Sequence, residues 1–236
     1  MSPGDTNHDI LFEDNHLLII NKRSSQIVQG DKTGDQPMSE MLKEFIRIRD
    51  HKPGNVFLGV VHRLDRSVSG AVIFAKTSKA LSRLNQMLKN GEISKTYWAI
   101  VKNPPGDAKG HLVHFLRRDE KKNKSFAYDK AVSNSQKAEL IYEVIAKSDN
   151  YFLLEVSLLT GRHHQIRAQL SKIGCPIKGD LKYGYDRPNP DRSIHLHARK
   201  VELIHPVKKE KLSVLAQPPD EPLWNFFLTT IHSETQ

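Results

Sequence analysis

A cluster of charged side chains separates two apolar runs in the first third of the chain. His62-Arg63-Leu64-Asp65-Arg66 lies between Val56–Val61 and Ala71–Ala75, and Ser69-Gly70 closes the segment. Loops fixed by rigid strands commonly carry catalytic residues, and a positioned, ionised carboxylate can serve as a nucleophile or a base. The same pattern also fits a charged surface turn. A protein-kinase catalytic loop is disfavoured, because a leucine separates His-Arg from Asp and no Gly-rich phosphate loop precedes them.

An aromatic pair follows in Lys95-Thr96-Tyr97-Trp98. Thr96–Val101 is predicted to be a strand, so Tyr97 and Trp98 point to opposite faces of a sheet. One ring can belong to the core while the other lines a site, where stacking on a base contributes about 1–3 kcal/mol. Ordinary sheet packing of both rings is the alternative.

A dense polar stretch stands at the start of a predicted helix that begins at Thr160-Gly161. Helix N-termini favour anions, and arginines there are natural partners of phosphates and carboxylates. The alternatives are a solvated helix face and a metal site. Adjacent histidines diverge, and His195 and His197 are better spaced but have no cysteine pair or carboxylate nearby, so no metal site is expected. The polar side chains are those of Arg162, His163, His164, Gln165 and Arg167.

The elements that must position these residues include more strands than helices. This pattern predicts an α+β fold, with a mixed, mainly antiparallel β-sheet core flanked by helices. We expect a loose N-terminus over residues 1–9 and one catalytic domain over residues 10–236. Arg117–Lys124 is predicted to be an exposed loop or edge. The predicted elements are a hairpin in Ile10–Lys22, a helix opened by Asp35 and Pro37, strands at Val56–Val61 and Ala71–Ala75, a helix capped by Ser78, strands at Thr96–Val101, Ala138–Ala146 and Phe152–Leu159, the helix from Thr160, strands at Ile194–Leu203 and Leu212–Ala216, and a helix at Glu221–Ile231.

Composition and charge bear on the partner and the cellular location of the protein. The 236 residues carry a formal net charge of +9, which favours a polyanionic partner, although an ordinary basic enzyme surface fits as well. No apolar run approaches the roughly 18 residues of a membrane span, and no apolar signal core opens the chain. The single cysteine, Cys175, cannot form an internal disulfide. We therefore expect a cytoplasmic protein without a membrane partner.

A fourth segment completes a family pattern. It contains Gly179-Asp180 and Tyr183-Gly184, and Leu196-His197-Ala198 follows. In this order the four segments resemble the RluA-type pseudouridine synthases, which are marked by His-Arg-Leu-Asp…Ser-Gly, Lys-x-Tyr-x-Ala, Gly-Arg-x-His-Gln-Ile-Arg and Gly-Asp…Tyr-Gly motifs. The resemblance covers about residues 10 to 216. It implies the catalytic domain only, without the S4-type RNA-binding domain that many relatives carry.

The resemblance also implies roles for individual residues. Asp65 is the catalytic aspartate, Tyr97 stacks on the target base, and Arg167 pairs with Asp65. The aspartate attacks C1′ or takes the 2′ proton, and the reaction needs no metal and no nucleotide cofactor. The uridine must be flipped out of its helix, and Arg63 can fill the vacated stack. The other expected RNA-binding residues are His62, Arg66, Lys95, Arg162, His164 and Gln165, and further candidate phosphate contacts are Lys22, Arg23, Arg117, Arg118, Lys121, Lys122 and Lys124.

Two positions depart from the family pattern. Val68 stands where the family usually has threonine, and His163 stands where the family usually has threonine or serine. They leave the reaction class untouched and bear on substrate choice. We expect a monomer that modifies a stem-loop in ribosomal or transfer RNA. The rival interpretations are a non-catalytic RNA-binding protein on the same scaffold and a metal-dependent hydrolase.

Overall fold

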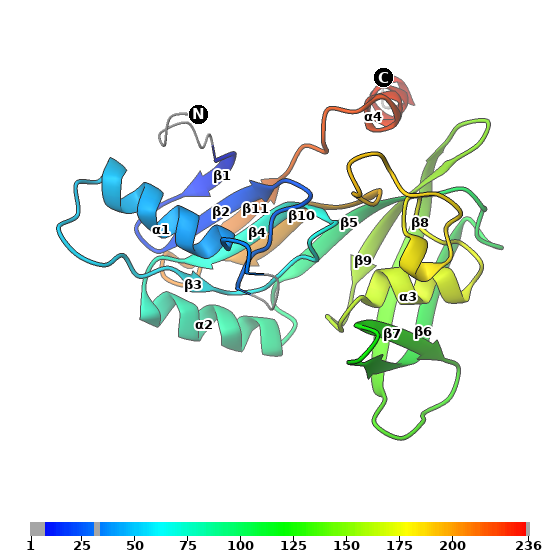
Figure 1. Cartoon of the computed structure of the whole chain (residues 1–236), viewed down its shortest axis with the longest axis horizontal. Coiled ribbons are helices and arrows are strands. Elements are labelled where there is room, and N and C mark those ends of the chain that lie inside the picture. The colour runs from blue at the N-terminus through cyan, green and yellow to red at the C-terminus, as the bar shows by residue number, and fades with distance from the viewer. Residues whose placement is uncertain (1–7, 31–33, 235–236) are drawn as a thin grey trace. The chain divides into compact units, whose positions relative to one another are not determined.

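The computed structural model describes residues 8–30 and 34–234 (Figure 1). Residues 1–7 of the expected loose N-terminus lie outside this range. The chain forms two compact units, the first comprising Met1–Ile93 with Lys200–Gln217 and the second Ser94–Arg199 with Pro218–Gln236. The boundary between the units falls inside strand β10 (Leu196–Ile204). The expectation of a single domain over residues 10–236 stays a prediction.

The first unit is built around the buried strand β4 (Ser69–Ala75). β4 pairs antiparallel with β2 (Leu17–Lys22) on one side and with the short β3 (Gly59–Val60) on the other, and β2 pairs with β1 (Ile10–Glu13). The end of β10 forms a hairpin with β11 (Lys211–Leu215). Helices α1 (Met38–Arg49) and α2 (Ser78–Lys89) complete the unit. A core that includes Leu17, Ile73, Leu84 and Val201 lies between these elements, because alternate strand residues face the same side.

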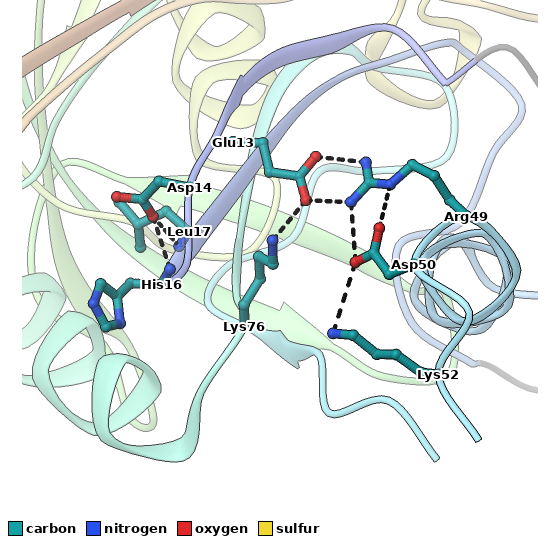
Figure 2. A network of polar contacts seen from close by, with 8 residues as sticks. All are labelled: Glu13, Asp14, His16, Leu17, Arg49, Asp50, Lys52 and Lys76. Atoms are coloured by element: carbon teal, nitrogen blue, oxygen red, sulfur yellow. Dashed lines mark hydrogen bonds and ion pairs between the residues drawn. The ribbon is translucent and has the colours of Figure 1, made fainter. Parts of the chain in front are cut away.

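Polar contacts fix the β1–β2 hairpin to its surroundings (Figure 2). Asp14 Oδ1 accepts hydrogen bonds from the amides of His16 and Leu17 at 2.8 and 2.9 Å, which shapes the turn. Glu13 binds Arg49 at the end of α1 at 2.7 Å and Lys76 after β4 at 2.6 Å. One carboxylate therefore joins three elements of the first unit.

The second unit contains an antiparallel sheet that follows the start of β10. Its order is β5 (Ser94–Val101), β9 (Phe152–Leu158), β8 (Gln136–Lys147), β6 (Lys109–Asp119) and β7 (Lys124–Tyr128). Helix α3 (Gln165–Lys172) packs through Ala168 with Leu116 and Ala138 of the sheet. Helix α4 (Pro222–Glu234) packs through Trp224 and Phe227 on Trp98. The mainly antiparallel α+β architecture expected from the sequence is confirmed.

Four local details differ from those predicted. The strand expected at Val56–Val61 shortens to β3, and Arg117–Lys124 is the end of β6 and its turn into β7. Helix α3 begins only at Gln165 because the amides of Leu159 and Thr160 donate to Glu139 O and His164 adopts a left-handed φ of 53°. Thr77 rather than Ser78 caps α2, since its Oγ1 accepts from the Ala80 amide. In the part of the chain that the structure describes, no helix has the length and apolarity to cross a membrane.

Candidate active site

Asp65 lies in a tight turn between β3 and β4 of the first unit. The Val68 amide donates to Asp65 O at 3.0 Å, and the buried Leu64 anchors the loop in the core. His62 Nε2 accepts a hydrogen bond from the Ile73 amide of β4 at 3.2 Å. These contacts fix the backbone on both sides of the carboxylate, which is the rigidity that a catalytic loop requires.

The two arginines that flank Asp65 are exposed and behave differently. Arg66 forms an ion pair with Asp35, whereas Arg63 makes no ion pair with any described residue. The guanidinium of Arg63 is therefore available to contact a ligand, and the role of His62 is at least partly structural.

Lys22 at the end of β2 lies beneath this turn. Its side chain is fully buried, and Nζ donates to the carbonyls of Arg23, Gln26 and Arg66 at 3.0, 2.9 and 3.3 Å. Burial lowers the pKa of Lys22 to about 7, while the charge of Asp65 opposes that shift. The expected phosphate contact at Lys22 is wrong, because its ammonium is committed to backbone carbonyls inside the protein.

Tyr97 and Lys95 occupy the same face of β5 in the second unit, since they are two residues apart on a strand. Tyr97 is 7% exposed, and Trp98 on the other face donates from Nε1 to Glu155 at 3.3 Å. A Cβ added at Gly161 would lie 3.5 Å from Lys95 Nζ, so the ammonium rests against the segment that leads into α3. Burial lowers the pKa of Lys95, and no described residue pairs with it.

Arg167 on α3 is held by a carboxylate that the motif analysis did not connect with it. Its Nε and Nη2 donate to Asp180 Oδ2 and Oδ1 at 2.7 and 2.8 Å, and both side chains are buried. The Tyr183 ring lies under the guanidinium at 4.9 Å from its centroid. The pairing of Arg167 with Asp65 involves residues of different units and stays a prediction.

A stacked pair of imidazoles precedes α3. The rings of His163 and His164 lie 3.8 Å apart with an interplanar angle of 22°. His164 Nδ1 contacts the Tyr183 hydroxyl at 3.0 Å, and His163 Nδ1 contacts Ser125 Oγ of β7 at 2.9 Å. The departure at position 163 thus links the α3 entrance to the β6–β7 hairpin. The other departure, Val68, is buried in the first unit.

Gln165 does not have the surface position expected of an RNA contact. It is 3% exposed, its Oε1 accepts from Thr160 Oγ1 and the Arg162 amide, and its Nε2 donates to Glu139 O at 2.9 Å. We correct that expectation, because the amide ties the α3 entrance to the sheet. Arg162 remains exposed, with Nε bound to Lys137 O at 3.1 Å.

The sequence did not predict which residues hold the site residues in place, although it identified the candidate site residues themselves. Asp180 was part of a recognised Gly-Asp segment, but only the folded chain shows that it binds Arg167. The burial of Lys22 had a weak signal, since four consecutive apolar residues precede it in the same strand. Among the described residues, no group of three or more histidine, cysteine, aspartate or glutamate side chains is placed to hold a metal ion.

Comparisons with known proteins agree with the motif pattern. Residues 16–172 match the family model described as RNA pseudouridylate synthase. An uncharacterized RNA pseudouridine synthase of Bacillus subtilis is 34% identical over 215 residues, covering 89% of this chain and 68% of the relative. The ribosomal large subunit pseudouridine synthase C of Vibrio cholerae is 31% identical over 215 residues, covering 89% and 65%. The chain thus spans about two thirds of the length of these curated relatives.

Solved structures show the same fold. The human RNA pseudouridylate synthase domain containing 4 aligns with a TM-score of 0.74 at 24% identity, covering 94% of this chain and 91% of that chain. The human RNA pseudouridylate synthase domain containing 1 aligns with a TM-score of 0.73 at 22% identity, covering 98% of both chains.

Proposed function

Because this chain belongs to the RNA pseudouridylate synthase family, we propose that it isomerises uridine to pseudouridine in structured RNA with Asp65 as its catalytic carboxylate. The observation that carries the proposal is the Asp65 turn, in which Lys22 Nζ and the Ser25 amide bind the Arg66 carbonyl and the Ile73 amide binds the His62 ring. A carboxylate held in this way loses little freedom when substrate binds, which favours catalysis by positioning.

The reaction breaks the N1–C1′ bond, turns the uracil and joins C5 to C1′, after which the C5 proton leaves and N1 is protonated. Asp65 supports it in one of two ways, by attacking C1′ or by accepting the 2′ proton. Both need the uridine extruded from its helix. In this proposal Tyr97, which is 7% exposed, supplies the ring on which the base stacks through its accessible part, and the exposed Arg63 fills the vacated space.

Arg167 orients the catalytic carboxylate in this proposal. The guanidinium is already fixed by Asp180 and Tyr183, so orienting a second carboxylate costs little further side-chain entropy. The exposed Arg66 and Arg162, together with Lys95, His62 and His164, are the proposed RNA contacts around this centre. The lack of an acid beside Lys95 among the described residues supports a phosphate as its partner.

We propose ribosomal RNA of the large subunit as the first substrate to test, because several relatives carry that substrate in their names. A transfer RNA stem-loop is the alternative. Mapping pseudouridine in both RNA classes from a strain that lacks this protein identifies the modified uridine. Action as a monomer in the cytoplasm remains a proposal, which light scattering and cell fractionation would test.

The central experiment measures tritium release from RNA labelled at uracil C5. The wild-type protein is expected to release tritium, and Asp65→Asn is expected to reduce the rate by at least about 10³-fold, since it removes the reacting group. Asp50→Asn, an exposed carboxylate of the same unit (Figure 2), is the matched control and should retain full activity. No release from any cellular RNA would favour a non-catalytic RNA-binding protein, and loss of activity on chelation would favour a metal-dependent hydrolase.

A further inference from the structure

The β6–β7 hairpin of the second unit has two unlike faces. Leu116 and Ser125 point to one face and are buried against α3 and Tyr183. The opposite face carries three cross-strand pairs, Phe115 with Tyr128, Arg117 with Phe126, and Asp119 with Lys124. Side chains directly opposite each other in an antiparallel pair lie on the same side, so aromatic and basic groups alternate along this face. We call it the hairpin platform.

Contacts within the hairpin platform orient its charges. The Arg117 guanidinium lies over the Tyr128 ring at 5.3 Å, and Nη2 donates to the Tyr128 hydroxyl at 2.9 Å. The ammonium groups of Lys122 and Lys124 lie 5.9 and 5.5 Å from the centre of the Phe126 ring. The Phe126 ring is only partly covered. Lys124 Nζ also lies 4.9 Å from the centre of the Tyr183 ring, so this ammonium stands between the two aromatic side chains.

The hairpin cations have no acidic partners. None of them forms an ion pair with a described residue, whereas neighbouring lysines on the same unit do, as in Lys137 with Glu139, Lys109 with Glu143 and Lys172 with Asp129. Two nearby acids, Asp119 and Glu120, leave an excess of positive charge. A cluster of uncompensated cations at a fixed surface attracts a polyanion. The cations of the platform and its turn that form no ion pair with a described residue are Arg117, Lys121, Lys122 and Lys124, whereas Arg118 stands opposite Ser125 on the other face of the hairpin.

The hairpin platform is held in place from behind. The Ser125 amide donates to the Tyr183 hydroxyl at 2.8 Å, Ser125 Oγ contacts His163, and Lys182 Nζ donates to Asn123 O in the turn at 3.1 Å. These bonds satisfy part of the exposed edge of β7. Ordering the hairpin on binding therefore costs little entropy, which favours affinity.

We propose that the hairpin platform is a second RNA-binding site, in which an unpaired nucleotide stacks on Phe126 while Lys122, Lys124 and Arg117 contact the adjoining phosphates. A phenyl ring offers no hydrogen bond, so the site accepts any base and discriminates single-stranded from paired RNA, because only an unstacked base exposes its face. The inference rests on the proposed function only in taking RNA as the ligand. It concerns the binding of the RNA and not the reaction at Asp65.

Binding of a fluorescein-labelled oligouridylate to the catalytically inactive Asp65→Asn protein tests the site by fluorescence anisotropy. Phe126→Ala and Phe126→Leu are each expected to weaken binding about 10-fold without changing the salt dependence, while Phe126→Trp retains affinity. Phe226→Ala, an exposed phenylalanine on α4 of the same unit, is the matched control and should bind like the parent. The leucine variant keeps an apolar side chain, so its loss of binding reports stacking rather than folding.

The charge contribution is measured in the same assay. Lys122→Gln combined with Lys124→Gln is expected to reduce the slope of log affinity against log salt by about 1.4, the value for two phosphate contacts on a single strand. Lys79→Gln combined with Lys89→Gln on α2 is the control for an equal change of net charge. Wild-type affinity in Phe126→Leu, or equal weakening of a fully paired RNA, would overturn the stacking site. Tritium release by the wild-type protein is scored separately, so the reaction and the hairpin platform can fail independently.

Discussion

Replacing Asp180 with asparagine isolates the charge of the buried ion pair behind Arg167. Asparagine has nearly the same shape as aspartate and still accepts one of the two hydrogen bonds. The Arg167 and Asp180 side chains are 7% and 1% exposed, so the guanidinium loses the counter-charge of Asp180 where water does not compensate. Breaking a buried pair by removing one partner costs about 3–5 kcal/mol. The retained hydrogen bond and the Tyr183 ring reduce this loss, so we expect about 3 kcal/mol.

Thermal unfolding followed by tryptophan fluorescence measures this effect directly. Both tryptophans, Trp98 and Trp224, belong to the second unit, as do Arg167 and Asp180, so the signal reports the unit that is perturbed. A loss of about 3 kcal/mol lowers the Tm by roughly 6–12 °C when the 236-residue chain unfolds as a whole. Activity should fall through kcat, because Arg167 is displaced while RNA contacts elsewhere persist.

Asp129→Asn is the matched control for this experiment. Asp129 also pairs with a cation of α3, Lys172, at 2.9 Å, but its side chain is 71% exposed. Water screens such a pair, so the Tm should remain that of the wild-type protein. Two outcomes would refute the idea that burial makes the Arg167–Asp180 pair contribute strongly to stability. One is a Tm for Asp180→Asn within about 2 °C of the wild type, and the other is an equal drop in both variants.

Two further predictions concern stability. Although burial raises the pKa of Asp14, hydrogen bonds from the His16 and Leu17 amides and from Lys208 lower the pKa to about 2. Asp14 therefore contributes about 2 kcal/mol of stability above pH 4 that is lost as the pH falls towards 2, and Asp14→Asn should flatten this acid limb in urea titrations. Gly179→Ala should cost about 3 kcal/mol, since φ is +85° and the new Cβ would lie 2.8 Å from Asn189 Cγ and 2.9 Å from Ser193 O. Gly174→Ala, at φ +79° with no atom within 4 Å, should cost only about 1 kcal/mol, and equal Tm values for the two variants would remove the steric explanation.

The sequence predicted the order of elements because most strands are runs of apolar residues bounded by residues that favour turns. Strand β6 was not predicted. Its exposed face carries Lys109, His111 and Arg117, and polar residues at these positions are also typical of a loop. Pairing with β8 decides its conformation, and pairing is a non-local property. The start of α3 was misplaced for a related reason, because contacts with Glu139 on a distant strand override the local helix signal.

Site residues were predictable by type but not by partner. The motif containing Asp65 is short and dense, so residues with chemical potential could be recognised along the chain. The partner of each charged side chain depends on the fold. Two lysines that the sequence predicted as phosphate contacts therefore have different surroundings in the structure. Lys22 is sealed under the Asp65 turn, whereas Lys122 stands on the hairpin platform without an acid among the described residues.

The buried ammonium of Lys22 also determines how this part of the chain opens. It binds the carbonyls of Gln26 and Arg66, which belong to segments about forty residues apart, and the Ser25 amide donates to Arg66 O as well. If either segment moved away alone, a charged group would be left inside the protein with too few acceptors, at a cost of several kcal/mol. We therefore expect the loop after β2 and the Asp65 turn to open together, with the contacts of Lys22 contributing to the free energy of that opening.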